Sequence, residues 1–179
     1  MSQAEMSLVD VRRALAPDAG ALSALAVDTF VATFGHLYKD EDLQFFLKKN
    51  HAAEVYAKLI ADPAFALWIA ERDGEAVAYS VAGPCDLPVP DKPANSGELA
   101  RLYLRDSAKG TGLAQAMLDE ALAWLRAHYA HIYLSVYHEN FRAQRLYASR
   151  GFVKIHDYFY MVGNHADPEW IMKLSPQSG

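Results

Sequence analysis

Residues Leu99–Gly112 read L-A-R-L-Y-L-R-D-S-A-K-G-T-G, and the predicted fold is arranged around this stretch. Its first part, residues 99–104, is mostly apolar and predicts a strand, which runs into a charged turn closed by Gly110 and Gly112. From residue 113 to residue 129 apolar side chains recur at helical spacing. The pattern therefore predicts a strand, a glycine-rich turn and a helix in succession.

A turn of this kind favours the binding of an anion. The first amides of a helix have no partner within the helix, and the helix dipole makes that end slightly positive. Glycines let a phosphate approach the backbone closely, and Lys109 and Arg105 would add positive charge around it. We expect the amides of residues 109–114 to hold a phosphate or pyrophosphate group.

Two common nucleotide-binding motifs do not fit the turn. The phosphate-binding loop G-x-x-x-x-G-K-[ST] does not occur anywhere in the chain. The dinucleotide fingerprint G-x-G-x-x-G fails at its third glycine, because Gln115 stands there and is too bulky for the close helix packing that this glycine permits. The sequence therefore favours neither of these two nucleotide-binding motifs.

The composition is that of a globular protein. With 179 residues, of which 52% are hydrophobic and 22% charged, the chain suits one domain spanning residues 1–179. The formal net charge of −5 and the lack of a long basic run disfavour a nucleic-acid partner. Cys85 is the single cysteine and fits a reducing compartment. No uninterrupted apolar stretch of membrane-spanning length and no signal peptide are recognised, so we expect a cytoplasmic protein without a membrane partner.

Other strands and helices follow from periodicity and turn signals. A short strand is expected at residues 8–15 and a hairpin at residues 65–81, where R-D-G separates two apolar runs. Residues 83–97, with four prolines, predict a long loop. The remaining elements are expected as helices from about residue 17 to 33, from residue 40, and at residues 51–60 and 141–149, and as strands at residues 131–137, 152–162 and 170–174.

The turn sequence K-G-T-G-L-A, residues 109–114, resembles the motif R/Q-x-x-G-x-G/A of the GNAT superfamily of acetyl-CoA-dependent N-acetyltransferases. In that family the motif lies between the fourth strand and the third helix and holds the pyrophosphate of the coenzyme. Gly112 and Ala114 fill its small positions, and Gly110 is present as in many members. Lys109 stands where the family usually has Arg or Gln, which leaves the backbone amides unaffected.

A second stretch carries the same resemblance. Residues 138–152 read H-E-N-F-R-A-Q-R-L-Y-A-S-R-G-F and are similar to the family pattern N-x-x-A-x-x-x-Y-x-x-x-G-F. The five matching positions are Asn140, Ala143, Tyr147, Gly151 and Phe152. Two motifs at the expected separation identify the chain as a member of the family.

The resemblance implies a fold and a co-substrate. The fold is a mixed α/β single domain, with a central, mostly antiparallel, twisted sheet of about seven strands flanked by helices. The co-substrate is acetyl-CoA, with the backbone of residues 102–104 pairing with its pantetheine arm, and a homodimer is common in the family. The residues expected to bind acetyl-CoA are Leu102, Tyr103, Leu104, Lys109, Gly110, Thr111, Gly112, Leu113, Ala114, Asn140, Ala143 and Tyr147.

The acceptor is expected to be a primary amine. Three stretches, starting at Thr29, Glu98 and Phe159, resemble the bacterial polyamine (spermine and spermidine) acetyltransferases and imply a polyamine. An amino acid, a protein N-terminus or an antibiotic amine remains an alternative acceptor. A non-catalytic domain that binds an acyl-CoA is an alternative of a different class, because both motifs describe coenzyme binding only.

Direct transfer needs a base for the amine and an acid for the leaving sulfur. By the resemblance, Tyr147 donates a proton to the sulfur, and its phenol is protonated at neutral pH. Glu98, at the head of the central strand, is the expected base, acting through water, and His138 is the rival. A strand amide near Tyr103 is expected to stabilise the oxyanion. Arg142 and Arg145 are interpreted as solvated, and no metal-binding spacing is present among the histidines.

Overall fold

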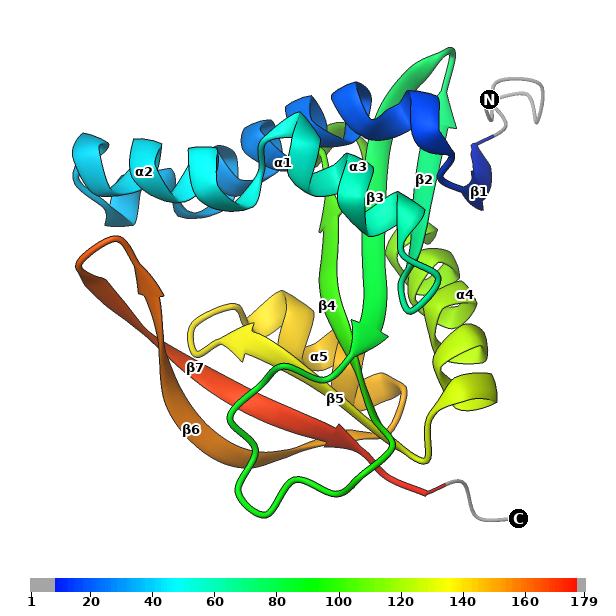
Figure 1. Cartoon of the computed structure of the whole chain (residues 1–179), viewed down its shortest axis with the longest axis vertical. Coiled ribbons are helices and arrows are strands. Elements are labelled where there is room, and N and C mark those ends of the chain that lie inside the picture. Colours follow the sequence, from blue (N-terminus) through cyan, green and yellow to red (C-terminus); the bar gives the residue numbers. More distant parts are fainter. Residues whose placement is uncertain (1–8, 177–179) are drawn as a thin grey trace.

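The computed structural model describes residues 9–176, and Figure 1 shows their arrangement. The strands are β1 (Asp10–Arg13), β2 (Ala66–Arg72), β3 (Glu75–Pro84), β4 (Ser96–Leu104), β5 (His131–Tyr137), β6 (Phe152–Val162) and β7 (His165–Leu174). The helices are α1 (Ala19–Phe34), α2 (Asp40–Asn50), α3 (Ala53–Ala61), α4 (Leu113–His128) and α5 (Phe141–Ser149). Short 3₁₀ turns precede and follow α1, and another one, Asp106–Ala108, precedes α4.

The described strands form a seven-stranded sheet in the order β1-β2-β3-β4-β5-β7-β6. All neighbours are antiparallel except β4 and β5, which are parallel and pair only over Ser96–Leu99 and His131–Leu134. Beyond this short ladder the two strands diverge (Figure 1). The expected fold class, a mixed α/β domain with a mostly antiparallel seven-stranded sheet, is confirmed.

A bulge bends β4 where it leaves β5. Ala82 of β3 pairs with Leu99, and Val81 pairs with Arg101, so Ala100 is an extra residue on β4. A bulge increases the local twist of a strand and turns the following side chains. From here onward β4 is hydrogen-bonded on its β3 side only, which opens the sheet at its centre.

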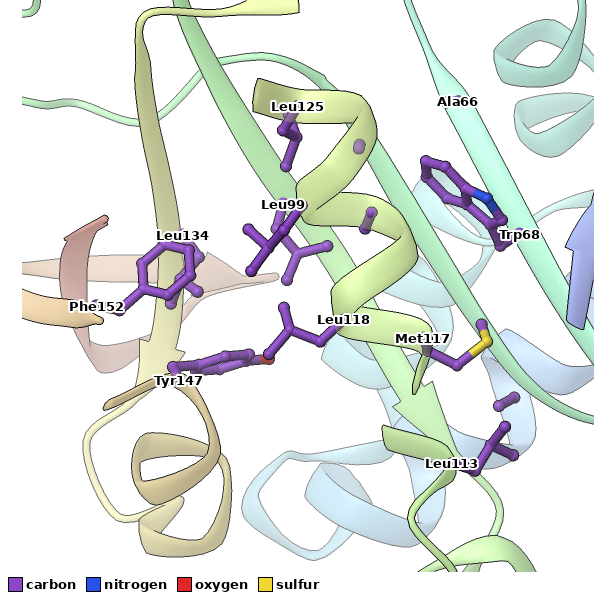
Figure 2. Packing of buried hydrophobic residues seen from close by; sticks show 14 of the residues in the cluster. Ala66, Trp68, Leu99, Leu113, Met117, Leu118, Leu125, Leu134, Tyr147 and Phe152 are labelled. Carbon is purple, nitrogen blue, oxygen red and sulfur yellow. The ribbon is translucent and has the colours of Figure 1, made fainter. Parts of the chain in front are cut away.

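Helices cover both faces of the sheet. On one face α4 and α5 bury a large apolar cluster that includes Leu118, Leu125 and Leu134 (Figure 2). On the other face α1 and α3 pack on β2 and β3 around Leu22, Leu25 and other buried residues. Each fully buried leucine contributes about 1.5–3 kcal/mol by leaving water, so the two clusters fix the sheet between its helices.

The helical stretch Ala16–Leu37, which contains α1, is long and apolar enough to cross a membrane by length and composition, with a mean hydropathy of 1.3. The sequence predicts no uninterrupted apolar stretch of this length. The present stretch is not uninterrupted, because it contains the polar residues Ser23, Asp28 and Thr29. In the fold, one side of α1 packs on α3 and β3.

Most expected elements are confirmed, and β5, α5 and β6 have the expected bounds. The predicted start of the last strand is wrong by five residues, since β7 begins at His165 and not at Trp170. The strand tolerates Pro168 because β7 pairs only with β6 at this position, so that no ladder bond to β5 is lost. The long loop is shorter than expected, since β3 continues to Pro84 and β4 begins at Ser96. The first strand covers only Asp10–Arg13, and the expected residue 8 lies outside the described residues.

Candidate active site

The first cavity lies between the diverging strands β4 and β5, and we call it the fork cleft. Its volume is about 530 Å³, and it is lined by Leu99–Leu104, by Ser135–Tyr137 and by residues of the glycine turn and of α5. Leu102, Tyr103 and Leu104 pair with β3 on one side and have no strand neighbour on the β5 side. Their backbone groups can therefore pair with an extended ligand lying in the cleft.

The glycine turn forms one end of the fork cleft. Gly110 and Gly112 have φ angles of +77° and +85°, a conformation that costs a residue with a Cβ about 1–2 kcal/mol. The first hydrogen bond inside α4 runs from the amide of Ala116 to the carbonyl of Gly112 at 3.2 Å. The amides of residues 113–115 therefore have no partner within the helix and are available to an anion.

Three residues expected to bind through this turn differ in the groups that they can offer to a ligand. The amide of Lys109 already donates to the carbonyl of Asp106 at 3.2 Å, so it is not one of the available donors. The side chain of Leu113 is buried in the core, which leaves only its amide to a ligand. Thr111 does not line the cleft, and its hydroxyl donates to the carbonyl of Ala108.

Positive charge at the turn comes from Lys109 and from α5, and not from Arg105. The side chain of Arg105 forms an ion pair with Asp28 at 2.9 Å and donates to the carbonyl of Ala76 at 3.0 Å, so the expectation that it faces a phosphate is wrong. Lys109, Arg142 and Arg145 line the fork cleft instead. A Cβ on Gly110 would lie 3.9 Å from a guanidinium nitrogen of Arg142, which places this arginine beside the turn. Arg142 is exposed, as expected for a solvated arginine, and it also lies where it can reach a phosphate bound at the turn.

Helix α5 brings the second motif to the same cleft. Asn140 caps the helix by accepting the amide of Ala143 at 3.2 Å, and both residues line the cleft. Gln144 donates to the carbonyls of Tyr137 and His138, which holds the start of α5 against the end of β5.

Tyr147 is buried between α5 and α4. Its ring packs edge-on against Phe152, and the side chain extends from α5 toward Leu118 (Figure 2). The residue is 7% exposed and lines the fork cleft. Burial, assisted by the charge of Glu169, raises the pKa of the phenol above its ordinary value, so Tyr147 keeps its proton at neutral pH.

The second cavity lies on the opposite side of β4, and we call it the aromatic pocket. Its volume is about 570 Å³. Its walls come from α1, α2, the loop after β3, β4, β5 and the β6–β7 hairpin, and many of its lining side chains are aromatic. The two cavities share the residues Phe34, Ala100, Arg101, Tyr103, Ser135 and Glu169. The bulged strand β4 is thus the common wall at which a ligand in one cavity meets a ligand in the other.

The hairpin is held against α2 by specific contacts. Asp42 accepts the amide of Asn164 at 3.1 Å, and Tyr38 donates to the carboxylate of Asp167. Tyr160 packs edge-on against Phe46. These contacts close the aromatic pocket on the side away from the sheet.

Glu98 lines the aromatic pocket but not the fork cleft. It is 9% exposed, and one carboxylate oxygen accepts the amide of Asp86 at 2.9 Å. Burial raises the pKa of this carboxyl to about 7. The expected base therefore lines the second cavity and is not among the residues that the two cavities share.

Glu169 is a site residue that the sequence analysis missed. It lies on β7, lines both cavities and accepts the hydroxyl of Ser135 at 3.0 Å. Burial, with the nearby charge of Asp167, raises its pKa to about 7. The alternation of Asp167 and Glu169 in D-P-E-W-I was the available signal, but the predicted strand began only at Trp170.

Arg101 is a second missed residue. It is largely buried in the wall shared by the cavities, and it donates to the hydroxyl of Tyr56 at 2.9 Å. Among residues 9–176 no carboxylate lies within ion-pair distance of its guanidinium group. Tyr56 also accepts or donates a hydrogen bond with His51 at 2.8 Å, and burial lowers the pKa of His51 to about 3, so that this histidine is neutral.

Two other residues considered from the sequence do not belong to the reacting centre. His138 lines neither cavity and lies 4.0 Å from Glu139. Cys85 lines the aromatic pocket, but burial raises the pKa of its thiol. In the part of the chain that the structure describes, no three histidine, cysteine or acidic side chains gather in a way that could hold a metal ion.

Comparison with known proteins agrees with this geometry. Residues 21–152 match the acetyltransferase (GNAT) family. An uncharacterised N-acetyltransferase of Mycobacterium tuberculosis (strain H37Rv) is 31% identical over 156 residues, which are 87% of this chain and 96% of the relative. An uncharacterised N-acetyltransferase of Lactobacillus delbrueckii subsp. lactis is 27% identical over 84% of this chain and 87% of its own length.

Solved structures share the fold at lower identity. The PaiA N-acetyltransferase from Thermoplasma acidophilum, solved in complex with coenzyme A, superposes with a TM-score of 0.74 and 18% identity, covering 94% of this chain and 99% of its own. The family match covers most of the chain, and the mycobacterial relative exceeds 30% identity over nearly its whole length. The chain therefore belongs to the acetyltransferase (GNAT) family and is an N-acetyltransferase that uses acetyl-CoA as its co-substrate.

Proposed function

We propose that this enzyme transfers the acetyl group directly from acetyl-CoA, held in the fork cleft, to a primary amine held in the aromatic pocket. One observation carries the proposal: the two cavities lie on opposite sides of β4 and meet at the bulge around Ala100. A thioester in one cavity and an amine in the other would thus approach each other without a covalent enzyme intermediate.

The coenzyme would be held mainly by backbone groups. The amides at the start of α4 would bind its pyrophosphate, with positive charge from Arg142 and Lys109. The free edge of Leu102–Leu104 would pair with the pantetheine arm. Asn140 and Ala143, at the start of α5, would form the opposite wall of the cleft.

The reaction needs a proton removed from the acceptor and a proton given to the sulfur. A primary amine with a pKa of about 10.4 is almost wholly protonated at neutral pH, so it must transfer a proton to a base before it attacks. Glu98, acting through water, is the base expected from the sequence, and Glu169 is a second carboxylate in the same pocket. Tyr147 would protonate the departing sulfur, and a β4 amide between Ala100 and Tyr103 would stabilise the oxyanion.

A polyamine is the acceptor that the sequence resemblance suggests. Three buried or half-buried carboxylates, those of Glu98, Asp167 and Glu169, line the aromatic pocket and can hold ammonium groups. The aromatic side chains around them can contact both the methylene segments and the cationic groups of such a molecule.

Arg101 favours a second acceptor class. A buried guanidinium group without a carboxylate partner is costly unless a ligand supplies the negative charge. An amino acid would offer an amine to the carboxylates and its own carboxylate to Arg101, whereas a polyamine would leave Arg101 uncompensated.

The test is the release of free thiol from acetyl-CoA by the purified protein with a panel of amines. The panel contains spermidine, spermine, small diamines, amino acids, an aminoglycoside and a peptide with a free N-terminus. Release with polyamines alone supports the first acceptor class, and release with amino acids alone supports the second. Binding of acetyl-CoA with no release above background on any amine would contradict the proposal and favour a domain that only binds acyl-CoA.

A further inference from the structure

We infer that Glu169, and not Glu98, takes the proton from the acceptor amine. The inference rests on the proposed function, since it assigns the base of that same transfer. It starts from the position of Glu169 on the wall that the two cavities share.

The carboxylates of Glu169 and Glu98 differ in the cavities that they line. Glu169 lines both the fork cleft and the aromatic pocket, whereas Glu98 lines the aromatic pocket alone. On the sheet, Glu169 pairs with Tyr137 of β5 on one side and with Tyr158 of β6 on the other. It therefore sits where β5 diverges from β4, beside the cleft in which the thioester would lie. A base has to reach the nitrogen that attacks the thioester, and this nitrogen must be at the junction of the cavities.

Hydrogen bonding leaves Glu169 one oxygen for the substrate. Its Oε2 accepts the Ser135 hydroxyl at 3.0 Å, and Ser135 in turn lies 2.6 Å from the hydroxyl of Tyr158. Among the described residues its Oε1 has no hydrogen-bond donor, so this oxygen is available to an ammonium group. Glu98 also has one bonded oxygen: its Oε1 accepts the amide of Asp86, which ties the side chain to the loop after β3, and among the described residues its Oε2 has no donor. The position of the two carboxylates, and not the number of available oxygens, therefore separates them.

The surroundings of Glu169 suit a base that is active near neutral pH. On its own strand the nearest titratable group is Asp167, and Tyr147 of α5 faces it from the fork cleft. The other titratable side chains that face it are Tyr38, Tyr103 of β4, Tyr137 of β5, and Tyr158 and Tyr160 of β6. Burial and Asp167 raise the pKa of Glu169 to about 7, and the Ser135 hydrogen bond opposes the rise. The phenols are neutral at this pH and Glu169 titrates; Glu98, whose pKa burial also raises to about 7, is distinguished from it by the variants below.

The step balances with two protein groups. The acceptor ammonium gives one proton to Glu169, and the neutral nitrogen forms the C–N bond with the thioester carbon. The C–S bond then breaks, and the sulfur takes the proton of Tyr147. The proton that the nitrogen loses on becoming an amide returns to Tyr147, so one proton remains on Glu169 and is released to solvent.

The pH dependence of kcat separates Glu169 from Glu98, with the best acceptor from the amine panel at saturation. Wild-type kcat should fall as the pH drops below about 7, as Glu169 becomes protonated. Glu169→Gln should abolish this acid limb and lower kcat about 10²-fold at pH above about 8, while Glu98→Gln should keep the limb. Asp157→Asn, an exposed carboxylate of β6, is the control and should match the wild type in both respects.

Two further readouts distinguish a proton acceptor from a structural role. A fluorinated analogue of the acceptor, whose amine has a lower pKa, needs the base less, so the deficit of Glu169→Gln should shrink severalfold with it. Ser135→Ala removes the hydrogen bond that lowers the pKa of Glu169 and should move the acid limb to higher pH. This second variant keeps the inference testable if Glu169→Gln does not fold, because Ser135 donates to Glu169 and not to Glu98.

The inference is overturned if the acid limb disappears in Glu98→Gln and persists in Glu169→Gln. It is also overturned if Ser135→Ala leaves the limb in place, or if the deficit of Glu169→Gln is the same for both amines. Absence of turnover by the wild-type enzyme on every amine would instead reject the proposed function itself.

Discussion

The fork cleft and the aromatic pocket share the strand β4 but are built in different ways. The fork cleft is formed largely by one continuous part of the chain, from Leu99 to Ser149, and it offers backbone amides and a helix N-terminus. The aromatic pocket is assembled from α1, α2, the loop after β3 and the β6–β7 hairpin, and it offers side chains. Under the proposed function, the coenzyme would therefore be recognised by local backbone geometry, and the acceptor by distant segments that folding brings together.

This difference also separates the charges of the two sites. Positive groups, Lys109, Arg142 and Arg145, gather at the fork cleft. Carboxylates gather at the aromatic pocket: Glu98 and Asp167 line only this pocket, whereas Glu169 and Arg101 line both cavities. A phosphate-bearing coenzyme and a cationic amine would therefore be directed to opposite sides of the same strand.

The largest effect is expected in the fork cleft, which Tyr147 lines. Tyr147→Phe should lower kcat about 10³-fold while leaving the Kd of acetyl-CoA nearly unchanged, because the ring still packs on Phe152 but no proton is available for the sulfur. Steady-state kinetics and calorimetric titration with acetyl-CoA measure the two quantities. Tyr129→Phe, at the far end of α4, is the matched control, and an equal loss in both variants would remove Tyr147 from the chemistry.

The next effect is a change in the free energy of unfolding on substitution of Glu98, which lines the aromatic pocket. Folding raises the pKa of Glu98 from 4.5 to about 7, so the native state holds this proton more tightly than the unfolded state. The contribution of Glu98 to stability is fully present below pH 4.5 and is lost as the pH rises through about 7. Glu98→Gln should therefore stabilise the protein by up to about 3 kcal/mol at pH above about 8 and change little at pH below about 4.

Chemical denaturation at the two pH values measures this difference. Glu120→Gln, at an exposed carboxylate on α4, is the matched control. A Glu98→Gln variant with the same free energy of unfolding as the wild type at both pH values would contradict the burial of a charged carboxyl on this side.

A smaller effect is expected on the coenzyme side. Arg142→Ala should weaken acetyl-CoA binding about 10-fold, since one charged hydrogen bond contributes about 1.5 kcal/mol, and kcat should stay nearly unchanged. Arg126→Ala, on α4 away from the fork cleft, is the control. A fall in kcat with an unchanged Kd would show that Arg142 acts on the reaction and not on the coenzyme.

The smallest effect on acetyl-CoA binding is expected for Arg105, at the edge of the proposed coenzyme site. Arg105→Ala should leave the Kd of acetyl-CoA unchanged within about twofold, because Arg105 pairs with Asp28 and lies outside the fork cleft. Its exposed ion pair contributes at most about 1 kcal/mol to stability. A loss of affinity equal to that of Arg142→Ala would place Arg105 at the phosphate after all.

The sequence predicted the local structure around the fork cleft well for a physical reason. Glycines at positive φ, a helix cap at Asn140 and an alternating strand at residues 131–137 are local features, and each leaves a local pattern. The error at Arg105 arose because charge near a turn does not reveal the direction of a side chain. Its partner Asp28 is on α1, far away in the sequence.

The acceptor side could be predicted only in part. Glu98 was recognised as a candidate at the head of β4, but Glu169 and Arg101 were missed. The bulge at Ala100 directs Arg101 toward the pocket, and the pairing of β7 beyond Pro168 brings Glu169 to the junction. Both depend on strand register, which is decided by contacts between segments distant in sequence.

Under the proposed function, both substrates occupy adjoining cavities at once. The most direct test is to measure initial rates while the concentrations of acetyl-CoA and of the best acceptor are varied together. Direct transfer across β4 predicts double-reciprocal lines that intersect, because acetyl-CoA and the amine must be bound together before the acetyl group moves. Parallel lines, accompanied by release of free thiol from acetyl-CoA before any amine is added, would show an acetylated enzyme intermediate and contradict this account.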